Sequence, residues 1–230
     1  MTVVIVSATP FEIAPLRAWL DEHFEEKEAN TFVKGTLKIQ CLITGVGQVK
    51  TAFHLATLLA TDRADLYINA GIAGSYVENF PIGTVLNVIA DRFGDLGVEE
   101  SNGDFTDVHQ MDLIPKDEFP FTKGLLKNPD ASSFKFLPRA YGVTVNTVKG
   151  SQQNIDKVIK KYEPEVESME GAAFAYACLQ SGVNFLQIRA ISNMVEPRNK
   201  ENWDLPLAIG KLNEILIGIL DAVGDARQIY

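Results

Sequence analysis

The sequence predicts an α/β fold, a three-layer α/β/α sandwich built around a twisted mixed central sheet. Two observations lead to this prediction. Runs of apolar, β-branched residues alternate along the chain with segments of helical periodicity, in the order strand, helix, strand, helix, strand. Several of the strand runs are apolar throughout instead of alternating, which is typical of strands that are covered on both faces of a sheet.

The N-terminal half is expected to repeat strand and helix. A strand at Val3–Ser7 is followed by Thr9–Glu12, whose sequence TPFE matches a capping box and predicts a helix start. Gly45 and Gly47 then mark a tight turn between the second strand and the second helix, where the backbone can closely approach another group. The expected elements are the strands Val3–Ser7, Leu37–Thr44, Leu66–Asn69 and Thr84–Ala90 and the helices Pro10–Leu20 and Gln48–Ala60.

The C-terminal half begins with an irregular region. Arg92–Tyr141 is rich in Gly, Pro, Asp and Phe and has poor periodicity, so it is either a lid, binding loop or interface, or a peripheral excursion without a role. The helix expected at Met169–Gln180 is apolar nearly all round, which predicts that it is buried. The remaining expected elements are the strands Val143–Thr147 and Asn184–Ser192 and the helices Gln153–Lys161 and Leu205–Ala222.

Length and charge exclude several classes of function. The 230 residues suit one domain, which we expect to span the whole chain. A net charge of −9 gives a surface that repels phosphate backbones, so we expect no nucleic-acid partner. No apolar run approaches the ~18 residues that span a membrane, so we expect no membrane partner. A strand starts at once with no basic region before it, which argues against a signal peptide and favours the cytoplasm.

Motifs for metals and cofactors are missing from the sequence. The three histidines are scattered without metal-ligand spacing, and Cys41 and Cys178 lie in apolar runs, as reduced core cysteines do. The dinucleotide-binding fingerprint fails after the second strand because its third glycine position holds Lys50. We therefore expect neither a metal site nor a cofactor.

Two carboxylates lie where ligands bind in open α/β sheets, beyond the carboxyl ends of strands. Glu12 follows the first strand and could act as a general acid or base, although its place in the capping box is an alternative explanation. Glu170 opens the buried helix, where the helix dipole keeps it ionised and able to accept hydrogen bonds from vicinal hydroxyls. The alternative is that Glu170 only complements that dipole.

Two further segments end strands on polar or glycine residues. Asn69–Ser75 has two glycines three apart, which can expose backbone N–H groups or simply form a turn. The last strand ends on Arg189, Ser192 and Asn193. A buried arginine needs a partner, so Arg189 is expected to form an ion pair with a local carboxylate. Asn193 either starts a turn or reads the edge of a ligand with an amide that both donates and accepts.

These segments together resemble the nucleoside phosphorylase/nucleosidase superfamily, and within it the methylthioadenosine/S-adenosylhomocysteine nucleosidases and the futalosine hydrolases. The pair SMEGAA from Ser168 and RAISN from Arg189, with its spacing, carries most of the resemblance. The segments FGDLGVE from Phe93, VTVNTV from Val143 and NMVEP from Asn193 are similar to futalosine hydrolases. The resemblance covers most of the chain and is weakest between Arg92 and Tyr141.

The resemblance implies a role for each candidate residue. It implies that Met169 packs against a ribose, that Glu170 accepts from its hydroxyls and that Glu12 activates the attacking water. It implies a substrate-binding role for the remaining residues Ile72, Ala73, Gly74, Val148, Arg189 and Ser192. The nucleosidases carry a Ser where this chain has Ile72, which removes one polar contact.

Asn193 stands where the adenine-specific nucleosidases carry an acidic residue that protonates adenine N7. Hypoxanthine presents two acceptors, N7 and O6, on the edge where adenine presents an acceptor and a donor. An amide can donate to two acceptors without being protonated, whereas an ionised Asp would be repelled. Both the hydrogen-bond logic and the resemblance therefore favour a 6-oxopurine base.

The expected function is hydrolysis of the N-glycosidic bond of a purine nucleoside. The resemblance implies futalosine as substrate and hypoxanthine and dehypoxanthine futalosine as products, a step of menaquinone biosynthesis. The alternatives are a methylthioadenosine/S-adenosylhomocysteine nucleosidase, a purine nucleoside phosphorylase and a catalytically silent nucleoside-binding protein.

The 5′ side of the substrate is left open by the sequence. A substrate carboxylate there would need a cation, and Arg198, Lys149 and Arg92 are the candidates. The resemblance also implies a homo-oligomer, with a neighbouring subunit near the site and the Arg92–Tyr141 region at the interface.

Overall fold

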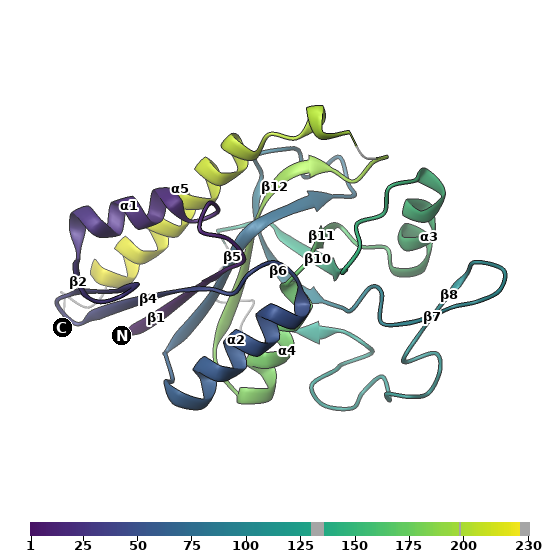
Figure 1. Cartoon of the computed structure of the whole chain (residues 1–230), viewed down its shortest axis with the longest axis horizontal. Coiled ribbons are helices and arrows are strands. Elements are labelled where there is room, and N and C mark those ends of the chain that lie inside the picture. The colour runs from purple at the N-terminus through teal and green to yellow at the C-terminus, as the bar shows by residue number, and fades with distance from the viewer. Residues whose placement is uncertain (130–135, 198, 226–230) are drawn as a thin grey trace.

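The computed structural model describes residues 1–129, 136–197 and 199–225 and confirms the predicted α/β fold (Figure 1). The strands of its large mixed sheet are β1 (Thr2–Ser7), β2 (Glu25–Glu28), β3 (Thr31–Lys34), β4 (Leu37–Ile43), β5 (Leu66–Ser75), β6 (Val85–Asp91), β9 (Leu126–Lys127), β10 (Arg139–Thr144), β11 (Val166–Ser168) and β12 (Phe185–Met194). Two short strands, β7 (Gly97–Glu99) and β8 (Phe105–Asp107), pair separately. The helices are α1 (Ala14–His23), α2 (Gln48–Thr61), α3 (Gln152–Tyr162), α4 (Gly171–Ser181), α5 (Leu205–Asp225) and the 3₁₀ turn η2 (Lys200–Asn202).

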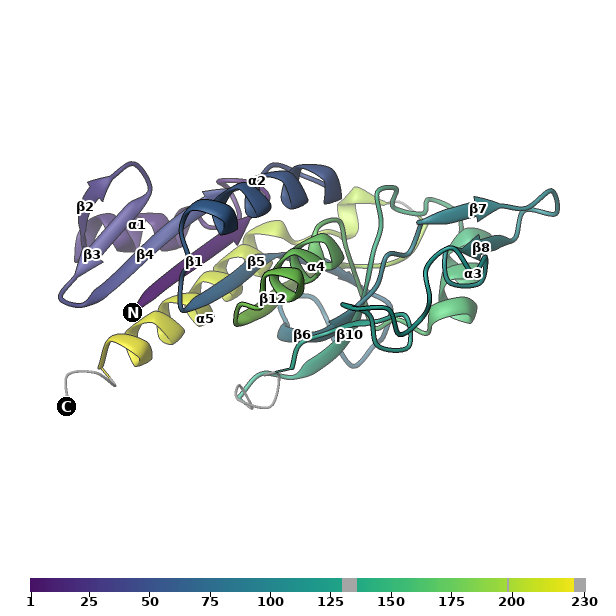
Figure 2. The same ribbon diagram turned by 90° about the horizontal axis from the view of Figure 1, so that it is seen from below.

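Helices cover both faces of the central strands. Val3 and Ile5 of β1 pack in one cluster with α1 and α5, and Val4 and Val6 pack in another with α2 and α4. Successive side chains of a strand point to opposite faces, so a strand between two helical layers needs apolar residues at every position. The β2–β3 hairpin and the β7–β8 pair lie at opposite ends of the molecule (Figure 2).

One end of the sheet closes on itself. β11 pairs with β10 on one side and with β5 on the other, which completes a ring of the strands β5, β12, β6, β10 and β11. Gly74 of β5 is consequently opposite Glu167 of β11 and Asn193 of β12. This closure brings the ends of three strands, which are far apart in the sequence, to one place.

Two expectations about the edges of elements are wrong. Helix α1 begins at Ala14 and not at Pro10, because residues 10–13 form a turn in which the Glu12 side chain points away from the helix. The segment Asn69–Ser75 is not a loop but the second half of β5, because β12 and β11 pair with it on either side.

Several strands are missing from the sequence-based expectation. The hairpin strand β2 is entirely charged and exposed, and β11 has only three residues, so neither shows an apolar period. β10 spans Arg139–Thr144, earlier than the expected Val143–Thr147. The irregular region from Arg92 contains β7, β8 and β9, and residues 130–135 lie outside the described part of the chain. No helix of the described residues is long and apolar enough to cross a membrane.

Candidate active site

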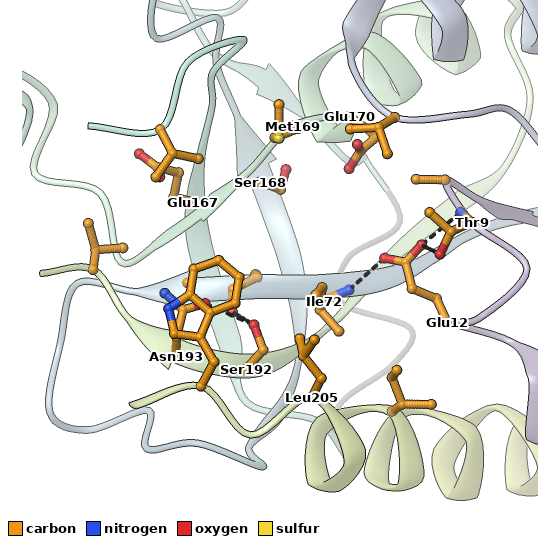
Figure 3. Close-up of a pocket in the computed structure, with 18 of the residues that line it drawn as sticks. Thr9, Glu12, Ile72, Glu167, Ser168, Met169, Glu170, Ser192, Asn193 and Leu205 are labelled. Carbon is orange, nitrogen blue, oxygen red and sulfur yellow. Dashed lines mark hydrogen bonds between the residues drawn. The ribbon is translucent and has the colours of Figure 1, made fainter. Parts of the chain in front are cut away.

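A pocket of about 410 Å³ lies where β1, β5, β11 and β12 end (Figure 3). Its size is within the range of small-molecule sites. Arg189 is not among the residues that line it, since its side chain lies 1% exposed behind Glu170. The structure brings the other residues expected at the site to the pocket wall: Glu12, Ile72, Ala73, Gly74, Val148, Met169, Glu170, Ser192 and Asn193.

Glu12 is held by backbone and hydroxyl donors at one end of the pocket, called here the Glu12 end. Its Oε2 accepts from the Thr9 backbone N–H at 2.9 Å, the Thr9 hydroxyl at 3.0 Å and the Ser7 hydroxyl at 3.2 Å. Its Oε1 accepts from the Ile72 backbone N–H at 3.2 Å. The side chain is only 7% exposed, so this set of donors fixes the carboxylate and compensates for its burial.

The capping-box prediction is half right about Glu12. Its carboxylate does accept from the Thr9 N–H, as a capping box requires, but Thr9 does not cap a helix because α1 starts later. The turn between β1 and α1 instead directs the carboxylate toward β5. The side-chain amide of Asn213 in α5 stabilises this turn by donating to the Glu12 backbone carbonyl at 2.8 Å.

Glu170 is the N-cap of α4 and lies at the Glu12 end of the pocket, on the same side as the β1 turn (Figure 3). Its Oε1 accepts from the Gly47 N–H at 3.1 Å, and its Oε2 lies 3.5 Å from Nη1 of Arg189. Gly47 has a φ of +98°, so this approach of the turn after β4 depends on a glycine. The ion pair expected for Arg189 and the close backbone approach expected for this turn are both present.

Gly71 leaves room for the Arg189 guanidinium and the Glu12 carboxylate, which both approach this position of β5. A Cβ atom on Gly71 would lie 2.4 Å from Nη1 of Arg189 and 2.9 Å from Oε1 of Glu12. Any larger residue would force the guanidinium or the carboxylate to move. The glycine is therefore required for a close approach of side chains rather than for a turn.

Asn193 and Ser192 form the other end of the pocket, called here the Asn193 end. The Ser192 hydroxyl donates to Oδ1 of Asn193 at 2.9 Å. The same hydroxyl lies 3.3 Å from the Ala73 carbonyl, so the nearer Oδ1 is its main acceptor. Nδ2 donates one hydrogen to the Met194 carbonyl at 2.9 Å and has a second hydrogen for a ligand. Gly74 lies beside it, because a Cβ there would be 3.2 Å from Nδ2.

Glu167 also lines the Asn193 end and was not singled out by sequence reasoning. The Tyr76 hydroxyl donates to its Oε2 at 2.6 Å. Burial raises the pKa of Glu167, which the hydrogen bond from Tyr76 and the charge of Lys149 lower in part. Burial and the neighbouring Glu167 raise the pKa of Tyr76 far above its usual range, so the phenol stays a donor.

The apolar wall of the pocket was also missed. Phe11, Val46, Trp203, Leu205 and Ile209 line it and come from the turns after β1 and β4 and from the start of α5. These residues have no pattern in common along the sequence. Their chemistry suits the face of a ring or an alkyl group.

The three cationic residues considered for binding a substrate carboxylate lie in different parts of the chain's structure or outside its described residues. Lys149 lines the pocket, and its charge acts on Glu167. Arg92 lies in a separate hollow, with its guanidinium 4.9 Å from the centre of the Tyr162 ring. Arg198 lies outside the described residues. Within the described part of the chain, no group of three or more His, Cys, Asp or Glu side chains could hold a metal ion.

The charges of the lining residues restrict what can enter. Among the described lining residues, Lys149 is the cation, and the carboxylates are Glu12, Glu167, Glu170 and Glu196. The carboxylates favour a ligand that presents hydroxyl and N–H donors to them, and among the described lining residues Lys149 is the cation that an acidic group of the ligand could meet. A carboxylate, a ring-packing Met169 and an amide in one pocket can activate water, hold a sugar and stabilise a leaving group.

The sequence is similar to known proteins along most of its length. The family model described as "Phosphorylase superfamily" matches residues 2–221. Futalosine hydrolase of Thermus thermophilus is 29% identical over 94% of this chain and 97% of its own length. A 5′-methylthioadenosine/S-adenosylhomocysteine nucleosidase of Geobacillus sp. is 28% identical over 89% of this chain and 90% of its own length.

Solved structures share the fold at lower identity. Futalosine hydrolase of Helicobacter pylori has a TM-score of 0.77 and 17% identity, over 96% of this chain and 98% of that one. A nucleosidase of Colwellia psychrerythraea, solved in complex with adenine, has a TM-score of 0.74 and 18% identity, over 96% of this chain and 95% of that one.

Proposed function

The chain belongs to the phosphorylase superfamily, and from that premise we propose that it is a purine nucleosidase acting on 6-oxopurine nucleosides, with futalosine as substrate. The observation that carries the proposal is the orientation of Asn193. Because the Ser192 hydroxyl occupies Oδ1, the amide offers an N–H to the pocket. The hydrogen of Nδ2 that Met194 does not take suits the acceptor edge, N7 and O6, of a 6-oxopurine.

Glu12 serves as the general base. In this proposal the sugar lies between Glu12, Met169 and Glu170, with C1′ toward the Glu12 carboxylate. A water held by Glu12 attacks C1′ as the bond to N9 breaks and the ribose passes through an oxocarbenium-like transition state. The C1′–N9 electron pair leaves with the base as an anion, and Glu12 takes the proton of the water. The released anion takes a proton from solvent to give hypoxanthine, and Glu12 returns its proton to solvent. General base catalysis of this kind contributes about 10²–10⁴-fold to a rate.

Asn193 stabilises the leaving base. Negative charge builds on the purine as the glycosidic bond breaks, and it spreads onto N7 and O6. A fixed N–H donor at that edge stabilises the transition state more than the ground state, which is the requirement for catalysis. The Ser192 hydroxyl keeps the amide in the required orientation throughout.

Water is the proposed nucleophile rather than phosphate. A phosphate site needs convergent cations or backbone donors. The described lining residues near Glu12 and Glu170 supply no arginine, and these two carboxylates would repel an anion. Glu170 instead suits the neutral hydroxyls of a ribose, since its oxygens are fixed by Gly47 and Arg189.

Futalosine is proposed because of the relatives. Futalosine hydrolases of Thermus thermophilus and of Acidothermus cellulolyticus are 29% and 28% identical to this chain over more than nine-tenths of its length. Hydrolysis of futalosine would give hypoxanthine and dehypoxanthine futalosine.

A second candidate is a methylthioadenosine/S-adenosylhomocysteine nucleosidase. The apolar wall formed by Phe11, Val46 and Leu205 favours it, since a methylthio group would pack there. Asn193 disfavours it, because the 6-amino group of adenine needs an acceptor, whereas Oδ1 is turned toward the Ser192 hydroxyl.

The protein is also proposed to be a homo-oligomer. Val49 and Phe53 on one face of α2 are 80% and 66% exposed, and Phe11 at the pocket rim is 76% exposed. Exposed apolar side chains gathered on one face are typical of interaction surfaces. Light scattering after size-exclusion chromatography would test this, and a mass of 25.3 kDa at micromolar concentration would contradict it.

The nucleophile can be tested with futalosine in buffers with and without phosphate. Hydrolysis predicts equal rates in the two buffers and a product with a free 1′ hydroxyl. Strict dependence on phosphate, with a sugar 1-phosphate as product, would show that the protein is a phosphorylase instead. Binding of hypoxanthine without any turnover would favour a catalytically silent binding protein.

A further inference from the structure

Glu167 and Asn193 occupy matching positions on the two strands that flank the end of β5. Both are opposite Gly74, Glu167 through the antiparallel pair with β11 and Asn193 through the parallel pair with β12. Opposite residues on neighbouring strands project to the same face of a sheet. The two polar side chains therefore rise into the pocket on either side of a residue that has none (Figure 3).

The space between these side chains suits one flat ring. Two strand spacings separate their backbones by about 10 Å. Side chains that rise in parallel keep about this separation, and a hydrogen bond of roughly 3 Å at each side then leaves about 4 Å for the ligand between them. Gly74 keeps the floor clear, since a Cβ there would lie 2.8 Å from a methyl carbon of Val195 and 3.2 Å from Nδ2 of Asn193.

One oxygen of Glu167 is already satisfied and the other is available. The Tyr76 hydroxyl donates to Oε2, and its own high pKa keeps it in the donor form. The described residues give no hydrogen bond to Oε1. Glu167 is 5% exposed and lines the pocket, so this oxygen is available to a ligand that enters the pocket.

We propose that Glu167 determines base specificity, with its Oε1 accepting a hydrogen bond from N1–H of a 6-oxopurine whose N7 and O6 face Asn193. The proposal rests on the proposed function and adds a second contact to it. Hypoxanthine and guanine carry a hydrogen on N1, whereas adenine has a lone pair there. A carboxylate attracts the first pattern and repels the second, so Glu167 and Asn193 select the same class of base through opposite hydrogen-bond roles.

The variant Glu167→Gln replaces one acceptor oxygen of the carboxylate by an NH₂ donor, with almost no change in the shape of the side chain. Its amide oxygen can still accept from Tyr76, and its NH₂ group then faces N1. We expect the Kd for hypoxanthine, measured by calorimetry, to rise at least tenfold, while the Kd for adenine stays level or falls. Tyr76→Phe is the matched control. It removes the neighbouring hydroxyl but keeps the carboxylate, whose two oxygens are both acceptors in any orientation, and so it should leave hypoxanthine preferred over adenine.

Equal weakening of both bases by Glu167→Gln would overturn the proposal, since it would mean that Glu167 only supports the wall of the pocket. A series of ligands on the unaltered protein tests the same point without relying on a variant. We expect 1-methylhypoxanthine, which lacks N1–H, to bind at least tenfold more weakly than 9-methylhypoxanthine, which keeps it. Equal affinities would also overturn the proposal.

The two proposals fail in different ways. If the unaltered protein releases no base from futalosine or inosine but still prefers hypoxanthine in binding, the nucleosidase function fails and the role of Glu167 stands. If it releases hypoxanthine while the selectivity of Glu167→Gln is unchanged, only the role of Glu167 fails.

Discussion

The two ends of the pocket hold their polar groups by different means. At the Glu12 end, backbone N–H groups of Thr9, Ile72 and Gly47 donate to the carboxylates of Glu12 and Glu170. The hydroxyls of Thr9 and Ser7 and the Arg189 guanidinium add side-chain contacts to the same two carboxylates. At the Asn193 end, side-chain hydroxyls of Ser192 and Tyr76 hold an amide and a carboxylate. Several donors, including main-chain N–H groups, hold each group at the Glu12 end, so one substitution there removes only part of the support, whereas loss of the Ser192 hydroxyl can reorient the Asn193 amide. Under the proposed function, water is activated at the Glu12 end, and the base is recognised and stabilised as it leaves at the Asn193 end.

The largest expected effect comes from Glu12→Gln. Loss of the general base should lower kcat for futalosine by about 10²–10⁴-fold. Because the change lies at the Glu12 end, the Kd for hypoxanthine should stay within about twofold of the original, and this binding measurement serves as the control for folding. Retained turnover would remove Glu12 from the mechanism, and lost hypoxanthine binding would contradict the separation of the two ends.

The next effect is that of Asn193→Asp. Ser192 would donate to one carboxylate oxygen, and the other would face N7 and O6 with a lone pair unless it is protonated. We expect kcat/KM for 6-oxopurine nucleosides to fall by about ten- to hundredfold, as the loss of a good base contact does. Cleavage of methylthioadenosine should rise relative to futalosine. An unchanged ratio between the two substrates would show that Asn193 does not face the base.

A smaller effect is expected from Ser192→Ala. Without the hydroxyl, Oδ1 of Asn193 loses its donor and the amide can turn over, which places an acceptor toward the base. Loss of one hydrogen bond costs about 1 kcal/mol, so kcat/KM for futalosine should fall about fivefold. Ser168→Ala is a matched control in the same pocket, because the Ser168 hydroxyl contacts the Gly171 N–H and not Asn193.

The smallest effect concerns stability at different pH. Burial raises the pKa of Glu167 above its ordinary value of 4.5. A carboxyl with a higher pKa in the folded chain adds stability below its unfolded pKa and loses that contribution as the pH rises through the folded pKa. Denaturant titrations should therefore show the unaltered protein losing stability relative to Glu167→Gln between pH 4.5 and neutral pH. An opposite trend would mean that the fold favours the ionised carboxylate.

The sequence predicts the Glu12 end better than the Asn193 end. Glu12 follows the expected first strand within a few residues, and Glu170 opens the expected apolar helix, so the local pattern locates both carboxylates. The prediction that the capping box at Thr9–Glu12 starts a helix was wrong, because a turn at residues 10–13 replaces the first turn of the expected helix. The ion pair of Arg189 could be expected because a buried guanidinium needs a counter-charge.

Glu167 and Tyr76 could not be found in the same way. Their contact depends on the pairing of β11 with β5, which joins residues about ninety positions apart. A strand of three residues within a polar segment has no period that reveals it, and the extension of β5 through Gly71 and Gly74 looks like a loop. Contacts that depend on closure of the sheet are set by tertiary pairing and not by local pattern.

The most direct test of the account is the identity of the base released in phosphate-free buffer. An equimolar mixture of futalosine and methylthioadenosine should be incubated with the protein and the free bases separated by chromatography. The account predicts that hypoxanthine appears at least tenfold faster than adenine. Faster release of adenine would contradict the roles assigned to Asn193 and Glu167, and would identify the protein as an adenine-specific nucleosidase.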